Sequence, residues 1–474
     1  MITWGISSES HNAALSVFAN DELIFASESE RFSGIKNDPY LNCEIINYAL
    51  NFGKPDLVCW YENPYKKSLR QIIAGQGWIR NIKKYVDAPI KYYNHHYTHA
   101  CAGYFTSNFN ECCIIVIDAI GEFQTLTIWE AKGNKLKLKF EVKYPHSIGL
   151  WYSAMTQRCG LKPNEEEYIL MGMSAYGDKH RYENDIYNDF IGSNIGEFKK
   201  NLHKGCKDWR LDITNKFDIA AATQSIYEKI FKDILKKALS IVKSKNLVFM
   251  GGCALNCSAN PIALHYFDNV WIMPAPGDNG SSIGAVLAHK KKHIDWVGPY
   301  LGYYIQPVST NEEIVDYILN NKLCGIARGR AEFGPRALGN RSLIADPRNF
   351  EIKSIVNNIK QREKFRPFSP VILEEFANDY FMMPVDSSPY MQYAMKCKEY
   401  KKFYSIVHID NTSRVQTVNK NQNSNLYDLL KLWHKRTGCP MLLNTSLNIK
   451  GKPIINSEKD CEDWQNTYKL KIFS

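Results

Sequence analysis

A run of six apolar residues from Cys112 to Ile117 constrains the fold of this chain more than any other stretch. Six apolar side chains in succession leave no polar face, which is typical of a strand buried on both sides in an α/β sheet. The run ends in Asp118, so a carboxylate would stand at the carboxyl end of a buried strand, where α/β sheets bind ligands. The sequence therefore predicts an α/β fold with a ligand site beside Asp118.

Three histidines lie just upstream, in the segment from Asn94 to Tyr104. If this segment is helical, His95 and His99 are four residues apart and project from one face, while His96 points elsewhere. Two neutral imidazoles and a carboxylate suit Fe(II), Zn, Mn or Co better than Ca or Mg. The alternative is a helix with satisfied histidines beside an ordinary strand, which a HxxxH pair alone would favour.

Two later strands run into glycine loops. The strand Asn246–Met250 leads into a double glycine at positions 251 and 252, and the strand Asn269–Met273 leads into the loop Pro276–Ser282. Glycine lets the backbone approach a ligand closely, and a following helix N-terminus favours anions. These loops predict nucleotide contacts, and Asp278 in the second loop is a candidate fourth metal ligand.

The N-terminal residues predict a β-hairpin, with strands over Ile2–Ile6 and Ala13–Phe18 and with His11 in a turn of small polar residues. Actin-like ATPase folds begin in this way, and the N–H groups of such a turn can face phosphate. A surface turn histidine is the alternative for His11. A charged segment from Glu28 to Lys36 follows, for which a solvated face is equally acceptable.

Composition narrows the class of protein. No stretch approaches the roughly 20 apolar residues that a membrane span needs. The 13 cysteines are scattered without CxxC pairs, and we find no signal peptide, which indicates a reduced, cytoplasmic protein. The net charge of +10 invites a polyanionic partner, but lysine is abundant throughout, so charge alone is weak evidence for nucleic acid. From 474 residues we expect two domains.

From about Val297 onward, arginines are interleaved with Gly, Pro, Ser and Phe. They gather in three motifs, Phe333–Ser342 (FGPRALGNRS), Lys360–Pro370 (KQREKFRPFSP) and Ser413–Thr417 (SRVQT), and a fourth motif of polar residues follows at Asn444–Asn448 (NTSLN). Converging arginines suit bidentate recognition of phosphate better than lysines do. The alternative is a basic surface held by packing.

Taken in order, these motifs resemble those of the O-carbamoyltransferase family, which includes nodulation and antibiotic-tailoring carbamoyltransferases. The resemblance covers nearly the whole chain. It implies an actin-like ATPase domain over residues 1–297, similar to the universal tRNA threonylcarbamoyl transferase, and a YrdC-like α/β domain over residues 298–474.

The resemblance also implies a set of site residues. Iron would be held by His95, His99, Asp118 and Asp278, with His11 beside the transfer centre. Nucleotide would contact Gly121, Gly251, Gly252, Asn256 and Gly280. Carbamoyl phosphate and ATP would contact Arg336, Arg341, Ser342, Lys360, Arg362, Arg366, Arg414 and Asn444. Two departures stand out: Asn12 replaces the family's usual Asp, and Ile169 replaces a usual Lys.

The implied activity is ATP-dependent carbamoyl transfer through carbamoyl adenylate, with Fe(II) or another divalent transition metal and with Mg on the ATP. The acceptor is a hydroxyl, by default on a sugar or natural product. Because Ser68–Tyr85 predicts a basic helix with aromatics, a hydroxymethylated pyrimidine in DNA is a second acceptor, and an ordinary solvated helix is the plainer alternative. A tRNA threonylcarbamoyl-type transferase and a non-catalytic actin-like nucleotide-binding protein are the rival functions. A homodimer is left open.

Overall fold

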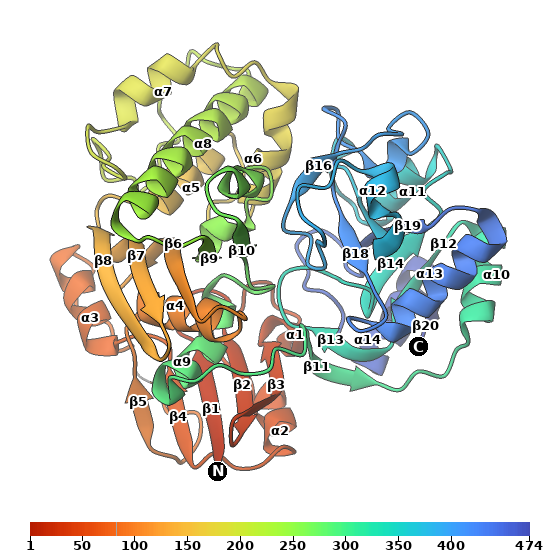
Figure 1. The fold of residues 1–474 in the computed structure, drawn as a ribbon, viewed down its shortest axis with the longest axis horizontal. Helices are drawn as coiled ribbons and strands as arrows, with labels where there is room; N and C mark the ends of the chain where they lie inside the picture. The colour runs from red at the N-terminus through yellow and green to blue at the C-terminus, as the bar shows by residue number, and fades with distance from the viewer. Residues whose placement is uncertain (82) are drawn as a thin grey trace. The chain divides into compact units, whose positions relative to one another are not determined.

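Two five-stranded sheets with the same strand order form the core of the first part of the molecule (Figure 1). The computed structural model describes residues 1–81 and 83–474, and these form two compact units. The first unit comprises Met1–Ile24 and Pro39–Trp296, and the second comprises Phe25–Asp38 and Val297–Ser474. The predicted α/β class is confirmed.

Each sheet of the first unit starts with three consecutive strands that lie side by side and continues with two later strands on the other side of the first one. The orders are β3-β2-β1-β4-β5 and β10-β9-β6-β7-β8, with β4 and β9 parallel to β1 and β6 respectively. The strands are β1 (Ile2–Ser7), β2 (Ala14–Ala19), β3 (Glu22–Glu28), β4 (Leu57–Trp60), β5 (Ile90–Tyr92), β6 (Glu111–Gly121), β7 (Gln124–Lys132), β8 (Lys135–Lys143), β9 (Asn246–Met250) and β10 (Asn269–Trp271). This duplicated order is that of the actin-like ATPase fold.

Two helices, α4 (His95–Phe105) and α9 (Ser281–Lys290), pack against each other and cover one sheet each. Helix α4 packs on β6 and β9, and α9 packs on β1, β2 and β4. A Cβ atom on Gly284 of α9 would lie 2.0 Å from the carbonyl oxygen of Thr98 in α4, so glycine is needed for this close approach. The approach brings the start of α4 near the loop that precedes α9.

The six-residue apolar run lies inside β6, and all six of its side chains are buried. The remaining helices of the first unit are α2 (Cys43–Leu50), α3 (Pro64–Ile73), α5 (Ile148–Arg158), α6 (Glu167–Met173), α7 (Glu183–Phe190) and α8 (Lys216–Ile241). Among the described residues, none of the helices combines the length and the apolar character required to cross a bilayer.

The helix predicted over Ser68–Tyr85 is present only as far as Ile73, and the prediction is wrong beyond that residue. Helix α3 ends at Ile73, and the described residues from 74 to 89 form neither helix nor strand. Gly75 and Gly77 have φ angles of 74° and 77°, a left-handed conformation that ends helices. Residue 82 lies outside the described residues.

The second unit is built on a six-stranded sheet in the order β18-β15-β19-β14-β12-β20, with a separate β11–β13 pair. Its strands are β11 (Tyr300–Ile305), β12 (Leu323–Ala327), β13 (Gly329–Glu332), β14 (Arg341–Ala345), β15 (Ser369–Leu373), β16 (Ala394–Lys396), β17 (Thr412–Arg414), β18 (Gln416–Val418), β19 (Met441–Ser446) and β20 (Ile472–Phe473). Its longer helices are α10 (Asn311–Asn321), α11 (Ile352–Ile359), α13 (Ser424–Thr437) and α14 (Glu458–Tyr468). The core gathers around Trp433 of α13, which is fully buried.

The segment Phe25–Asp38 belongs to the second unit, although the sequence analysis assigned it to the first domain. It contains the short helix α1 (Glu30–Ser33). Glu28, Glu30 and Arg31 are all buried, so the interpretation of this charged segment as a solvated face is wrong.

Candidate functional site

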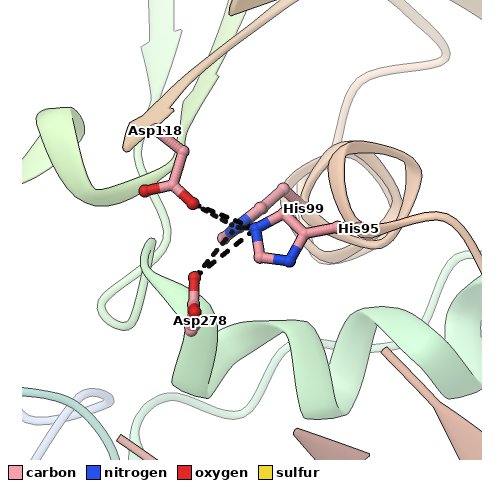
Figure 2. Close-up of side chains that lie close together, drawn as sticks. All are labelled: His95, His99, Asp118 and Asp278. Atoms are coloured by element: carbon pink, nitrogen blue, oxygen red, sulfur yellow. Dashed lines mark hydrogen bonds and ion pairs between the residues drawn. The ribbon is translucent and has the colours of Figure 1, made fainter. Parts of the chain in front are cut away.

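The structure brings together the four side chains that were predicted to hold a metal (Figure 2). His95 and His99 stand one turn apart at the start of α4, Asp118 lies in β6 three residues before its end, and Asp278 lies in the loop before α9. His95 Nε2 is 2.9 Å from Asp118 Oδ2 and 3.5 Å from Asp278 Oδ1. His99 Nε2 is 3.5 Å from the same two oxygens and 3.0 Å from His95 Nε2.

These distances fit a shared ion. Nitrogen and oxygen ligands at about 2.0 to 2.2 Å from a metal lie about 3 to 3.5 Å from one another when they surround it. The four candidate ligand atoms all lie within 4.8 Å of one another, and three of the four residues are buried. Two imidazoles and two carboxylates form a donor set that suits Fe(II), Zn, Mn or Co.

The charges at this centre depend on one another. Burial alone would raise the pKa of Asp118, but its hydrogen bonds with His95 and His99 hold that pKa well below the usual range. Burial lowers the pKa of His95, but Asp278 and Asp118 outweigh it and raise that pKa to about 9. His96 differs, because burial and the neighbouring His95 hold its pKa well below the usual range.

Two residues that the sequence analysis did not assign to the site support His95. The carboxylate of Glu122 accepts a hydrogen bond from the His95 backbone N–H at 3.1 Å, and burial raises the pKa of Glu122. The ring of Tyr61 packs edge-on against the His95 ring, with 5.2 Å between centroids. A sequence signal existed for both, because Tyr61 directly follows β4 and Glu122 directly follows β6.

The glycines predicted to contact nucleotide make room for the four candidate metal ligands and their neighbours. A Cβ on Gly121 would lie 2.2 Å from the ring of His95, and one on Gly280 would lie 1.9 Å from the carbonyl oxygen of Ala275. Gly251 has a φ of 90°, and the N–H of Gly252 donates to Asp118 Oδ1 at 3.2 Å. A nucleotide role for them stays a prediction.

Asn256 is held by protein contacts. Its side-chain amide donates to Gln224 Oε1 at 2.9 Å, and its oxygen accepts from Ala259 N–H at 3.1 Å. These two bonds fix the turn that follows β9, so the nucleotide contact predicted for Asn256 also stays a prediction.

His11 is exposed in the turn between β1 and β2. Because β1 and β4 are parallel, this turn lies at the same edge of the sheet as Tyr61, whose ring contacts His95. The backbone oxygen of Glu9, in the same turn, accepts from Lys67 Nζ at 2.9 Å. Asn12 has a left-handed φ of 58°, which an Asx residue tolerates well. Ile169 is buried in α6.

In the second unit, the eight predicted phosphate ligands fall into two groups. The first group is held by the protein. Arg341 is fully buried and donates to five backbone carbonyls, those of Tyr303, Arg328, Gly329, Asn340 and Asn456. Ser342 accepts from Gly339 N–H, and the Asn444 amide donates to Ala337 O and Gln416 Oε1.

The second group contains four arginines and Lys360, of which Arg362 donates to Asn357 Oδ1 and Pro367 O, and Arg366 to Glu363 Oε2. Arg336, Arg362, Arg366 and Arg414 are half-buried. Lys360 is buried, and its ammonium donates to Ser446 and Asn448. Burial, together with the nearby charges of Arg362 and Arg366, holds the pKa of Lys360 well below its usual range. Such mutually repelling cations favour the binding of an anion.

Models of one protein family match both halves of the chain. The model described as the carbamoyltransferase N-terminus matches residues 58–287, and the model described as the carbamoyltransferase C-terminus matches residues 315–473. The nodulation protein NolNO of Sinorhizobium fredii is 29% identical, over 95% of this chain and 76% of that protein. The nodulation protein NolO of Bradyrhizobium diazoefficiens is 31% identical, over 77% of this chain and 75% of that protein. An uncharacterized protein of Methanocaldococcus jannaschii is 31% identical, over 95% of this chain and 94% of that protein.

Solved structures match 61% of the chain. They include the activator of the 2-hydroxyisocaproyl-CoA dehydratase from Clostridium difficile with bound ADPNP, with a TM-score of 0.36, 13% identity and 96% of that chain covered. Full-length HypF in the phosphate- and nucleotide-bound form gives a TM-score of 0.35, 12% identity and 46% coverage. At such scores the fold assignment rests on the duplicated sheet order instead.

Proposed function

This chain belongs to the carbamoyltransferase family and is a carbamoyltransferase, and from that premise we propose that it makes carbamoyl adenylate from carbamoyl phosphate and ATP and passes the carbamoyl group to an acceptor hydroxyl. The observation that carries the proposal is the presence, in one chain, of a four-ligand metal-type centre and a separate cluster of cations. Neither feature alone accounts for both activation and transfer.

Activation is proposed for the second unit. Water would cleave the C–O bond to phosphate in carbamoyl phosphate, giving carbamate and inorganic phosphate. A carbamate oxygen would then attack the α-phosphorus of Mg-bound ATP, and pyrophosphate would leave. Arg336, Arg366 and Arg414 are the candidates for neutralising phosphate charge, because they are half-buried. Arg341 and Lys360 would instead stabilise the surrounding fold, because Arg341 donates to the carbonyl oxygen of Tyr303 and Lys360 donates to Asn448 Oδ1.

Transfer is proposed for the first unit. The acceptor oxygen would form a bond to the carbamoyl carbon, the bond from that carbon to the AMP oxygen would break, and AMP would leave. His11 would take the acceptor's proton, because it lies exposed in a turn at the same sheet edge as Tyr61, whose ring contacts His95. Gly121, Gly251, Gly252, Asn256 and Gly280 would shape the backbone around the adenylate.

Fe(II), or another divalent transition metal, would be held by His95, His99, Asp118 and Asp278. Such an ion supplies positive charge that binds and polarises phosphate oxygen. The Glu122 contact to the His95 backbone would fix the start of α4, so that both imidazoles keep their direction. A cytoplasmic location is part of the proposal, and the 13 unpaired cysteines among the described residues favour it.

The test is pyrophosphate release by the purified chain. We expect release from ATP only when carbamoyl phosphate is present, and we expect labelled carbamoyl phosphate to yield labelled carbamoyl adenylate when no acceptor is added. An Asp316→Asn variant, which changes an exposed ion pair with Arg436, serves as the control. Release that is independent of carbamoyl phosphate would contradict the proposal. Absence of release under both conditions would favour a tRNA threonylcarbamoyl-type transferase or a non-catalytic nucleotide-binding protein.

For the acceptor, a pocket in the first unit favours a molecule that carries negative charge. The pocket has a volume of about 420 Å³ and is lined by Glu9, Tyr40, Ile79, Arg80, Asn81, Lys83 and Lys84. Lys83 Nζ lies 5.2 Å above the ring of Tyr40 and 5.1 Å from that of Tyr85. Cations interleaved with aromatic rings suit nucleic acid, so a hydroxymethylated pyrimidine in DNA is a candidate beside the sugar or natural-product hydroxyl.

Salt dependence separates these acceptors. On duplex DNA, the logarithm of the binding constant should fall with the logarithm of salt concentration by about 0.9 per phosphate contact. Lys83→Gln should reduce this slope, whereas Lys135→Gln, on exposed β8, should leave it unchanged. Turnover on sugars that does not depend on salt, with none on DNA, would remove the nucleic-acid acceptor.

A further inference from the structure

The segment Phe25–Asp38 belongs to the second unit and contacts the FGPRALG loop of the same unit. Glu28, at the end of β3, is 2% exposed, and Arg31 in α1 is 4% exposed. Charged side chains are almost never buried to this extent unless they are paired or hydrogen-bonded. Their partners therefore indicate why the chain holds them there.

Both side chains bind Gly334. The backbone N–H of Gly334 donates to Glu28 Oε1 at 2.6 Å, and Arg31 Nη2 donates to the carbonyl oxygen of Gly334 at 2.8 Å. Arg31 Nε is also 3.6 Å from Glu28 Oε2, so the two side chains form a buried ion pair around one residue. Both backbone groups of Gly334 are thus held by residues about 300 positions earlier in the chain. We name these two side chains the Gly334 clamp.

The other end of the loop is held by a second carboxylate. Glu332 Oε1 accepts from the N–H groups of Leu338, Asn340 and Arg341 at 2.6, 2.8 and 3.3 Å. Glu332 is 1% exposed. The backbone is therefore fixed at Gly334 and again from Leu338, and Arg336 lies between the two anchors.

Gly334 also has a φ of 125°, a conformation that residues with a Cβ rarely adopt. Two charge-assisted hydrogen bonds to its backbone select this conformation. A rigid backbone beside a half-buried arginine fixes the direction in which that arginine leaves the loop.

We propose that Glu28 and Arg31 are positioning residues, which hold Gly334 so that Arg336 is presented to the phosphate of the activation reaction. The proposal rests on the proposed function, because it assigns Arg336 to phosphate. It also means that the activation site needs an N-terminal segment and is not complete within residues 298–474.

The experiment uses the full-length chain with Glu28→Gln, Arg31→Ala and Arg31→Lys. Lys36→Gln is the matched control, because it breaks the Lys36–Glu30 ion pair in the same segment. Three quantities are measured for each variant: amide hydrogen exchange in the peptide that contains Gly334, the kcat and KM of pyrophosphate release, and carbamoyl transfer from added carbamoyl adenylate.

Glu28→Gln removes a charged acceptor, so exchange at Gly334 should accelerate about tenfold or more, and kcat/KM for pyrophosphate release should fall by a similar factor. Arg31→Ala should behave alike, and Arg31→Lys should recover part of the loss because a donor and a charge remain. Transfer from added adenylate should stay within about twofold of the wild type, which shows that the chain is folded. Lys36→Gln should leave all three quantities near wild type.

Two results would overturn the proposal. One is unchanged exchange at Gly334 in Glu28→Gln. The other is accelerated exchange with pyrophosphate kinetics that stay at wild-type values, which would leave the clamp a purely structural role. Failure of the proposed function is distinct, because then the wild type itself releases no pyrophosphate in response to carbamoyl phosphate.

Discussion

The candidate metal centre of the first unit and the arginine motifs of the second unit differ in what their polar atoms already bind. At the metal centre, two imidazole nitrogens and two carboxylate oxygens point at one another, and among the described residues the Nδ1 atoms of His95 and His99 have no hydrogen-bond partner. In the second unit, Arg341 and Asn444 are bonded to the protein. Arg341 and Asn444 therefore stabilise the fold, and phosphate contacts are proposed instead for the half-buried arginines of the same motifs.

The largest effect is expected at the metal centre. His99→Ala removes one of four ligands, so metal affinity should fall by more than about a hundredfold, because even changes outside the ligand set cost 10-fold to 100-fold. Metal content of the purified variant by mass spectrometry measures this. His96→Asn is the control, because His96 lies on the same helix and bonds to Thr127. Metal retained at wild-type level in both His99→Ala and His95→Ala would refute the ligand assignment.

The second prediction compares two arginines of one motif. Arg336→Ala should abolish pyrophosphate formation with little change in the free energy of unfolding. Arg341→Ala should lower that free energy by about 3 kcal/mol or more, because five buried carbonyls lose their donor. Denaturant unfolding and pyrophosphate assays on both variants check this. The contrast disappears if Arg341→Ala is as stable as wild type and loses only activity.

The third prediction concerns the glycine beside His95. Gly121→Ala would place a Cβ 2.2 Å from the His95 ring, so the imidazole must move, and metal affinity should fall by about tenfold. Gly277→Ala is the matched control, because its φ is −80° and a Cβ there would lie 3.6 Å from Asn279 Oδ1, an ordinary van der Waals contact. Equal metal affinity in the two variants would show that Gly121 does not set the position of His95.

The smallest expected effect is the uptake of part of a proton by Lys360 when phosphate binds. Its pKa is lowered by burial and by Arg362 and Arg366, so its ammonium loses a proton at a pH below the ordinary value of 10.5. A bound phosphate anion favours the charged form, so binding in the window between the lowered pKa and 10.5 should take up part of a proton. Calorimetry with inorganic phosphate in two buffers of different ionisation enthalpy measures this. The uptake should vanish in Lys360→Met, and uptake that persists there belongs to another group.

The same Lys360 shift gives stability a definite pH dependence. Because the folded-state pKa lies below the unfolded value, the unfolded chain binds more protons in that window, and Lys360 makes stability rise with pH there. Below the folded-state pKa the lysine is charged in both states and adds no slope.

Local sequence patterns predicted the helices and strands that depend on residues close together in the chain. The apolar run of β6 and the HxxxH spacing of α4 are set by neighbours in sequence, so the strand and the helix were found at the expected places. Asp278 could be predicted as a candidate metal ligand because it lies in a strand–loop–helix connection. The helix predicted over Ser68–Tyr85 does not continue beyond Ile73, because Gly75 and Gly77 adopt left-handed backbone conformations. The composition of the segment otherwise favours a helix.

Long-range partners could not be predicted from local patterns. Nothing near Glu28 in the sequence indicates Gly334, which lies 306 residues later, and nothing near Arg341 indicates the five carbonyls around its guanidinium. A buried charge depends on groups that only the folded chain brings together. The assignment of Phe25–Asp38 to the second unit has the same origin.

The central claim is that activation and transfer occupy separate sites, and ATP–pyrophosphate exchange tests it most directly. Radiolabelled pyrophosphate is incubated with ATP, carbamoyl phosphate and either wild type, His99→Ala or Arg336→Ala. We predict that label enters ATP with wild type and His99→Ala, since activation does not need the metal centre, and that it does not enter with Arg336→Ala. Loss of exchange in a folded His99→Ala variant, or wild-type exchange in Arg336→Ala, would contradict the division into two sites.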